Sequence, residues 1–74
     1  MDTEEAVERA VRFLEEKAGY YTHRLVSVRL DKDRWHLEFD VGALLKEIVK
    51  IVIDDKTGRV VEFERPEYLS LIHI

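Results

Sequence analysis

The sequence predicts an α+β fold in which one N-terminal helix packs on a four-stranded antiparallel meander sheet, forming a two-layer sandwich. The first observation is a β-hairpin signal at residues 48–63, where two runs rich in β-branched side chains flank the turn formers of residues 54–58. The second is a helical spacing of apolar residues over 3–18, and the third is the alternation of apolar and polar residues over 25–41. A chain of 74 residues is expected to form a single domain, residues 1–74.

Residues 3–18 are expected to form an amphipathic helix. Asp2 or Thr3 can cap its N-terminus, because a side-chain oxygen there accepts a hydrogen bond from a free backbone N–H. Apolar residues then recur at helical spacing and form one stripe: Val7, Ala10, Val11, Leu14 and Ala18. We expect this stripe to cover one face of the sheet and the charged opposite face to contact water.

Four strands are expected, at about residues 25–31, 34–41, 47–54 and 59–65. Because successive side chains of a strand face opposite sides of the sheet, residue parity predicts the covered face. It is expected to hold Val26, Trp35, Leu37, Phe39, Ile51 and Val61. Pro66 has no N–H to donate to a strand ladder, so the last strand should stop near Arg65.

The turn between the last two strands is the best-defined local feature. Asp54 is favoured where a turn begins, because its carboxylate can accept hydrogen bonds from the backbone two residues on. Gly58 can adopt φ > 0, which a type I turn closed by a G1 bulge requires. We therefore expect a tight hairpin here.

Residues 43–52 admit two interpretations. As a helix, they would place on one face Leu44, Leu45, Ile48, Val49 and Val52. As a strand, they would use the β-branched residues that crowd positions 48–53, and this crowding favours the strand. In that interpretation Gly42 marks a bend or bulge before the strand.

The composition argues against several classes of function. Twelve Lys and Arg against 16 Asp and Glu give a net charge of −4, which disfavours non-specific nucleic-acid binding. No apolar run approaches the roughly 20 residues that span a bilayer, so we expect no membrane association. The start Met-Asp-Thr-Glu-Glu is acidic where an export signal is basic, and there is no cysteine for a disulfide. We therefore expect a cytoplasmic protein.

One compositional feature is unusual for a short chain. The sequence contains no Asn, Gln or Cys, and 38% of it is Asp, Glu, Lys or Arg. Loss of thermolabile side chains together with enrichment in charge is typical of heat-adapted proteins. Chance in a short chain is the alternative explanation.

The order of elements carries a resemblance. A capped helix precedes a strand containing Val26-Ser27-Val28 and a second strand, Trp35-His36-Leu37-Glu38-Phe39. A third strand, Ile51-Val52-Ile53-Asp54, then leads through Lys56-Thr57-Gly58 to Val60. Over residues 3–65 this order resembles a PepSY-type domain, which has a cystatin-like architecture.

The resemblance implies a role in restraining peptidases and, for many members, export or membrane tethering. This chain departs from that pattern, because no export signal or anchor is expected. It has Val41-Gly42 but no Gln where cystatin inhibitors carry a Gln-x-Val-x-Gly loop.

Catalytic chemistry finds little support in the sequence, and we expect no enzymatic activity and no cofactor. The two serines lack a nucleophile-elbow context, and the three glycines are too scattered for a phosphate-binding loop. His36, Glu38 and Asp40 alternate onto one strand face, where they could converge on a divalent ion or another ligand. The simpler interpretation is a polar outer face without a metal, and we adopt it.

The remaining signal indicates protein–protein interaction. Parity places four aliphatic residues on the outer face of the sheet: Leu25, Ile48, Val52 and Val60. An apolar segment, residues 67–74, follows the last strand and contains Tyr68, Leu69, Leu71 and Ile72. Apolar surface of this kind on a small acidic domain is typical of an interface, although the segment could also pack within its own chain. The sequence therefore predicts a homodimer, or a complex with another protein, formed by the outer face or an edge strand.

Overall fold

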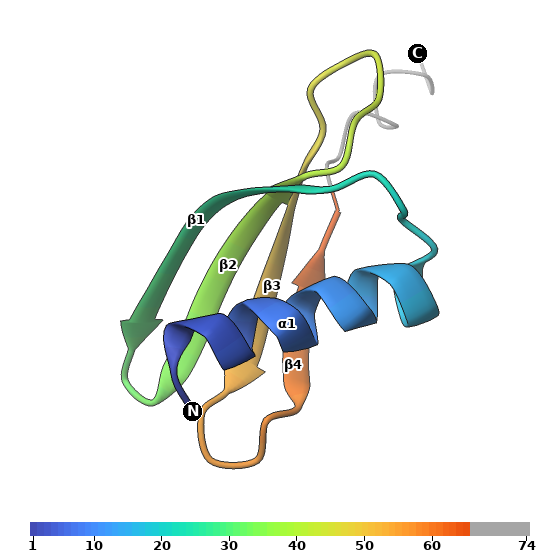
Figure 1. Cartoon of the computed structure of the whole chain (residues 1–74). Helices are drawn as coiled ribbons and strands as arrows, with labels where there is room; N and C mark the ends of the chain where they lie inside the picture. The colour runs from blue at the N-terminus through green and yellow to red at the C-terminus, as the bar shows by residue number, and fades with distance from the viewer. Residues whose placement is uncertain (66–74) are drawn as a thin grey trace, which may run out of the picture.

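The computed structural model describes residues 1–65 and shows one helix lying along one face of a four-stranded sheet (Figure 1). The helical segment comprises α1 (Thr3–Phe13) and a π-helical turn, η1 (Leu14–Ala18). The strands are β1 (Arg24–Asp31), β2 (Arg34–Asp40), β3 (Ile48–Asp54) and β4 (Val60–Glu64). Their order in the sheet is β1-β2-β3-β4, and each neighbouring pair is antiparallel. The predicted α+β meander is confirmed, and each element begins and ends within one residue of its expected position. The predicted apolar segment, residues 67–74, lies outside the described residues.

The start of α1 is stabilised as its sequence predicts. Asp2 is the N-cap, and its Oδ1 accepts a hydrogen bond of 2.8 Å from the backbone N–H of Glu5. Glu4 and Glu5 place negative charge in the first turn, where the helix dipole is positive. Glu5 also pairs with Arg9 one turn later, at 3.3 Å.

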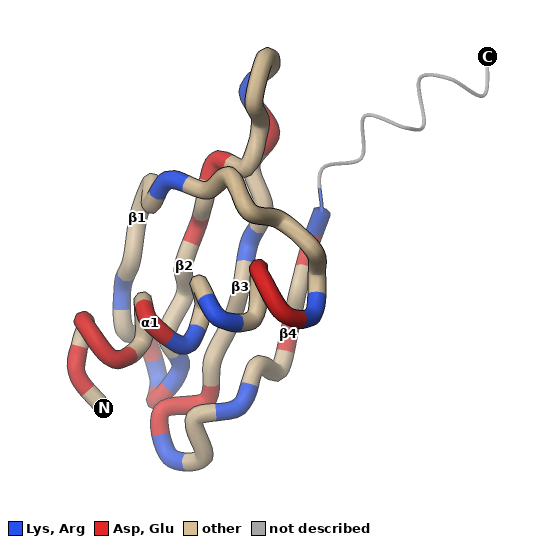
Figure 2. The backbone as a smooth tube through the Cα atoms, turned by 45° about the vertical axis from the view of Figure 1, so that its right-hand side comes forward, with Lys and Arg blue, Asp and Glu red and all other residues tan. Residues whose placement is uncertain are grey.

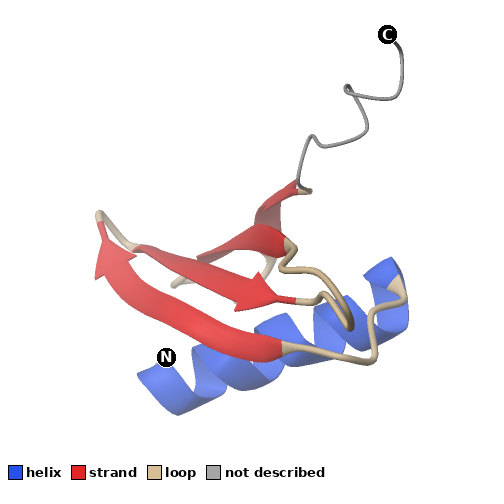
Figure 3. Ribbon diagram, turned by 90° about the horizontal axis from the view of Figure 1, so that it is seen from above, coloured by secondary structure: helices blue, strands red, loops and turns tan. Residues whose placement is uncertain are grey.

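The core lies between the helix and one face of the sheet, and Figure 3 shows these two layers from above. The helix contributes Ala6, Ala10 and Leu14, all fully buried. Two of the three are small, which brings the helix backbone close to the strands. The sheet contributes Trp35, Leu37, Phe39, Val41, Val49, Ile51 and Ile53. Ala6, which the predicted stripe does not include, is thus part of the contact.

The β3–β4 turn confirms the hairpin prediction. Asp54 Oδ1 accepts hydrogen bonds from the backbone N–H groups of Lys56, at 2.8 Å, and Thr57, at 3.1 Å. Gly58 has φ of 73°, and its N–H donates to the Asp54 carbonyl oxygen at 2.8 Å. The hydrogen bonds from the backbone N–H groups of Thr57 and Lys56 to the carboxylate lower the pKa of Asp54 below its ordinary value of 3.8.

Four of the face assignments made from parity are wrong, two in each edge strand, because each edge strand carries a one-residue bulge. In β1 the register shifts between Leu25 and Ser27, so Leu25 pairs with Phe39 and lies on the helix side of the sheet. In β4 the shift leaves Val60 paired with Ile53, also on the helix side, where it packs against the core. The residues expected to be covered there, Val26 and Val61, are instead the extra residues of the bulges, and both are exposed.

Residues 48–52 belong to a strand, so the strand interpretation of residues 43–52 is confirmed for that part. Residues 41–47 form a loop that joins β2 to β3. Gly42 is required by a close approach, because a Cβ on it would lie 2.8 Å from the Leu45 carbonyl carbon and would overlap the attached oxygen. The bend expected at Gly42 is therefore present.

Candidate functional site

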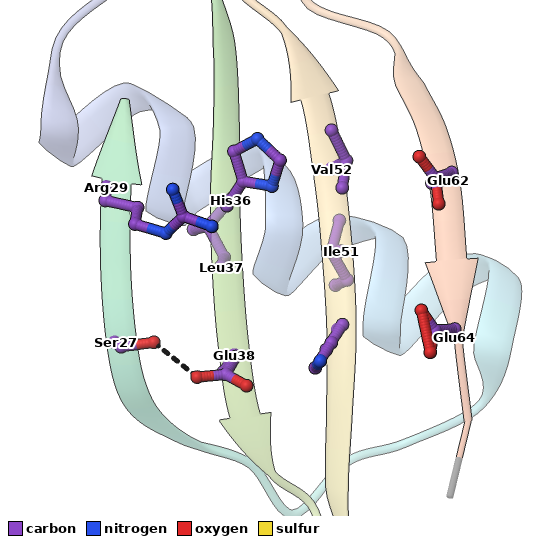
Figure 4. A pocket seen from close by; sticks show the side chains of 10 residues that line it. Ser27, Arg29, His36, Leu37, Glu38, Ile51, Val52, Glu62 and Glu64 are labelled. Carbon is purple, nitrogen blue, oxygen red and sulfur yellow. Dashed lines mark hydrogen bonds between the residues drawn. The ribbon is translucent and has the colours of Figure 1, made fainter. Parts of the chain in front are cut away.

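The outer face of the sheet, away from the helix, carries two rows of side chains that run across all four strands. One row is Ser27, Glu38, Lys50 and Glu64, and the other is Arg29, His36, Val52 and Glu62. They line an open hollow of about 260 Å³, seen in Figure 4. The rows follow from the antiparallel register, which sets paired residues on one face of the sheet.

This hollow is mainly polar, and along the row of Glu38, Lys50 and Glu64 the charges alternate in sign. Ser27 donates a hydrogen bond of 2.8 Å to Glu38 Oε1 (Figure 4). Lys50 is paired in register with Glu38 on one side and Glu64 on the other. Val52 forms the apolar part of the floor and is 8% exposed, because its polar neighbours surround it. Of the four aliphatic residues predicted for this face, the register therefore retains Ile48 and Val52.

His36, Glu38 and Asp40 share the outer face of β2, as predicted, but the structure does not bring all three together. His36 and Glu38 line the hollow, whereas Asp40 is buried at the end of β2. Its Oδ1 accepts hydrogen bonds from the backbone N–H groups of Gly42, at 3.0 Å, and Glu47, at 3.2 Å. Among residues 1–65, no three His, Asp or Glu side chains lie close enough together to hold a metal ion. Asp40 thus holds the two ends of the loop that follows β2.

The electrostatics of Asp40 agree with this structural role. The backbone N–H groups of Glu47 and Gly42 lower the pKa of the Asp40 carboxyl below its ordinary value, and the nearby Arg24 adds to the effect. Arg24 Nη2 lies 3.1 Å from Asp40 Oδ2. Sequence reasoning treated Asp40 as a candidate ligand and missed the loop that it closes. An Asp two residues before a Gly is a turn signal that could have indicated it.

The loop closed by Asp40 presents two leucines to solvent. Leu44 is 97% exposed and Leu45 is 82% exposed. A backbone hydrogen bond of 2.8 Å from Val41 N–H to the Glu47 carbonyl oxygen joins the two ends of the loop. The sequence did not single out these leucines as an exposed pair.

The edge strand β1 carries several exposed apolar side chains. The helix packs mainly on β2 and β3, so the helix side of β1 is only partly covered (Figure 1). Leu30 is 51% exposed and Leu25 is 41% exposed, and Val28 between them is half-buried. The predicted interface residue Leu25 is therefore exposed on the helix side of this edge and not on the outer face.

The opposite edge, β4, is better covered. Val60 and Phe63 pack against the core, and the Phe63 ring meets the ring of Phe13 at a centroid distance of 5.2 Å. Glu62 and Glu64 occupy its outer face. The predicted interface residues that follow this strand, Tyr68, Leu69, Leu71 and Ile72, lie outside the described residues.

Figure 2 shows that Lys and Arg are spread over the helix, β1 to β3 and the turns, among acidic residues. No helix among residues 1–65 combines the length and the apolar character needed to cross a bilayer. No family model matches the chain, and no curated protein or solved structure matches it either. The resemblance to PepSY-type domains therefore stays a prediction, and the fold and its surfaces are what support a functional proposal.

Proposed function

We propose that this protein is a non-enzymatic interaction module that binds another polypeptide strand along the edge of β1. The observation that carries the proposal is the exposure of β1. It is an eight-residue edge strand with a neighbour on one side within residues 1–65, and its side chains Leu25 and Leu30 are 41% and 51% exposed. Edge strands of this kind are templates for strand addition.

The turn between β1 and β2 fixes which backbone groups of β1 point outward. Its central residues, Lys32 and Asp33, have φ of 51° and 63°, as a two-residue type I′ turn requires. In such a hairpin Asp31 belongs to a hydrogen-bonded pair, and bonded and non-bonded pairs alternate from there. Leu30 and Val28 consequently stand in non-bonded pairs with β2, and their N–H and C=O groups point away from it. An added strand would hydrogen-bond to these groups.

An added strand would bury apolar side chains of β1 that are now exposed to solvent. Full burial of a leucine contributes roughly 1.5–3 kcal/mol, so covering the exposed part of Leu25 or Leu30 would contribute roughly 1 kcal/mol each. The two outward-facing residues would add hydrogen bonds with a net value of about 1 kcal/mol each. The sum indicates a modest affinity unless further contacts are made.

The β4 edge is the weaker candidate for strand addition. It has five residues, and its apolar side chains Val60 and Phe63 already pack against the core. Glu62 and Glu64 would repel an acidic partner at this edge. The proposal therefore commits to β1.

Amide hydrogen exchange measured by NMR tests this proposal. The probe is a synthetic peptide with the sequence of residues 24–31, added to the labelled protein over a dilution series. We expect the amides of Val28 and Leu30 to become protected, either at high protein concentration or on addition of the peptide, while the exposed Val61 of β4 serves as the control. Protection at Val61 alone, or at none of these amides under any condition, would contradict strand addition at β1.

A further inference from the structure

We infer that the hollow on the outer face of the sheet binds a short peptide with free ends, about three residues long, whose carboxylate lies at Arg29 and His36 and whose ammonium group lies at Glu62. This inference goes beyond the proposed function, because the hollow does not use the backbone edge of β1. The argument comes from the charges of one row of side chains, from the buried floor between them and from the distance between the ends of the row.

The row that crosses the hollow has opposite charges at its two ends. It begins with Arg29 on β1, continues through His36 on β2 and Val52 on β3, and ends with Glu62 on β4. All four side chains line the hollow (Figure 4). The row therefore has a basic end, an apolar middle and an acidic end, and a ligand with the opposite arrangement of charges complements it.

The charges of this row are not matched within the described part of the chain. Arg29 Nη1 lies 3.7 Å from Asp31 Oδ2 on its own strand, and both side chains of this pair are exposed. Such a pair contributes little to stability, so the Arg29 guanidinium remains available to a ligand. None of the ion pairs among residues 1–65 includes Glu62.

The neighbouring rows on the same face offset their own charges. In one of them Lys50 lies in register between two glutamates, and in the other Arg34 lies in register between two aspartates. Opposite charges at adjacent positions of a sheet face stabilise each other. The row that begins at Arg29 is therefore the one that favours a ligand charged at both ends.

Each end of the row suits one end of a peptide. Figure 4 shows the Arg29 side chain extending from β1 toward His36. A guanidinium donates two parallel hydrogen bonds to a carboxylate, and an imidazole N–H can donate to the same group. At the other end Glu62 and Glu64 both occupy the outer face of β4, where their carboxylates can accept hydrogen bonds from an ammonium group.

The dimensions of the hollow set the length of the ligand. His36 on β2 and Glu62 on β4 lie two strand spacings apart, about 10 Å. An extended chain spans about 3.3–3.6 Å per residue, so three residues cover this distance, whereas two fall short and five exceed it. The volume of about 260 Å³ is below the roughly 300–1,000 Å³ of pockets that hold drug-sized ligands, which agrees with a small occupant.

Titration of the isotope-labelled wild-type protein with trialanine, followed by NMR, tests the inference. The reporters are the ring of His36 and the backbone amide of Val52, and the amide of Val61, outside the hollow, is the control. We expect saturable shifts at both reporters with an affinity in the millimolar range, because the hollow is open to water. Acetylation of the amino end or amidation of the carboxyl end should each weaken binding roughly fivefold, since each removes one charge. Dialanine and pentaalanine should also bind more weakly than trialanine.

Charge-removing variants identify which end of the peptide meets which residue. Arg29→Gln and Glu62→Gln should each weaken the binding of trialanine roughly fivefold. Amidation of the peptide should then make no further difference to Arg29→Gln, and acetylation none to Glu62→Gln, because the partner of the removed charge is already missing. The matched control is Arg34→Gln, which removes the same charge from the same face outside the hollow and should bind as the wild type does.

Three results would overturn the inference. They are the absence of shifts at His36 and Val52, equal binding of free and blocked peptides, and an equal loss of affinity in Arg34→Gln. The first two come from the wild-type protein, so they decide the question even where a variant fails to fold. Strand addition at β1 is measured separately, at the amides of Val28 and Leu30, and either proposal can fail while the other stands.

Discussion

Replacing Gly42 with alanine should destabilise the protein more than its place in a surface loop suggests. A Cβ there would lie 2.8 Å from the Leu45 carbonyl carbon, whereas ordinary contacts begin at 3.4 Å. The loop must therefore move by at least about 0.6 Å, the difference between these distances, and the overlap with the carbonyl oxygen requires more. Backbone atoms cannot rotate away as the end of a long side chain can.

The magnitude follows from two costs. Steric overpacking of this kind typically costs about 1–3 kcal/mol. Movement of the loop also strains the hydrogen bond from Val41 N–H to the Glu47 carbonyl oxygen, which is worth about 1 kcal/mol net. We therefore expect Gly42→Ala to lower the free energy of unfolding by about 2–4 kcal/mol, a large fraction of the stability of so small a domain.

Urea denaturation followed by circular dichroism measures this change. The matched control is Leu44→Ala in the same loop, which removes a side chain that is almost fully exposed and should change the free energy of unfolding by less than about 0.5 kcal/mol. The reasoning would be refuted if Gly42→Ala were as stable as the wild type, or if the control lost as much stability.

Three further predictions concern the core and the carboxylates. Leu14→Ala should cost about 2–5 kcal/mol in urea denaturation, because Leu14 is fully buried between helix and sheet, and a change below about 1 kcal/mol would contradict the packing. Asp55→Ala should lower the free energy of unfolding by about 1–3 kcal/mol and alter the fluorescence of the single tryptophan, because Asp55 Oδ1 accepts a 2.7 Å hydrogen bond from Trp35 Nε1. Unchanged emission and unchanged stability would exclude that hydrogen bond. Folding lowers the pKa values of Asp40 and Asp54, so their ionised carboxylates stabilise the folded state. This contribution to the free energy of unfolding is complete above the ordinary Asp pKa of 3.8 and is lost as the pH falls from there through the lowered pKa values. The urea midpoint should therefore drop on acidification below about pH 4, less steeply in Asp54→Asn, and a midpoint that rose would show the sign to be wrong.

Local chemistry was sufficient to predict the order of the elements. The Asp2 cap, the helical stripe and the alternation of β2 act over a few residues, so the same forces operate whatever the rest of the chain does. The hairpin at residues 54–58 is local in the same sense, and its hydrogen bonds to Asp54 match the prediction.

The candidate site was harder to predict, because it depends on partners distant in sequence. Parity counting assumes an unbroken strand, and the bulges that move Leu25 and Val60 to the helix side arise from how an edge strand fits its neighbour. Asp40 was assigned to a polar outer face, with a ligand role as the alternative, and the structure places its carboxylate against the backbone of the loop that follows.

From the amino-acid sequence alone came the α+β meander, the bounds of its helix and strands, and the hairpin turn at Asp54. The tertiary structure alone showed which edge is uncovered, since that depends on where a single helix comes to rest across four strands. The helix lies over β2 and β3, β4 is closed by Phe13 and Phe63, and β1 keeps its leucines in water. One narrow helix cannot cover the full width of a four-stranded sheet, and that mismatch leaves the surface on which the proposed function depends.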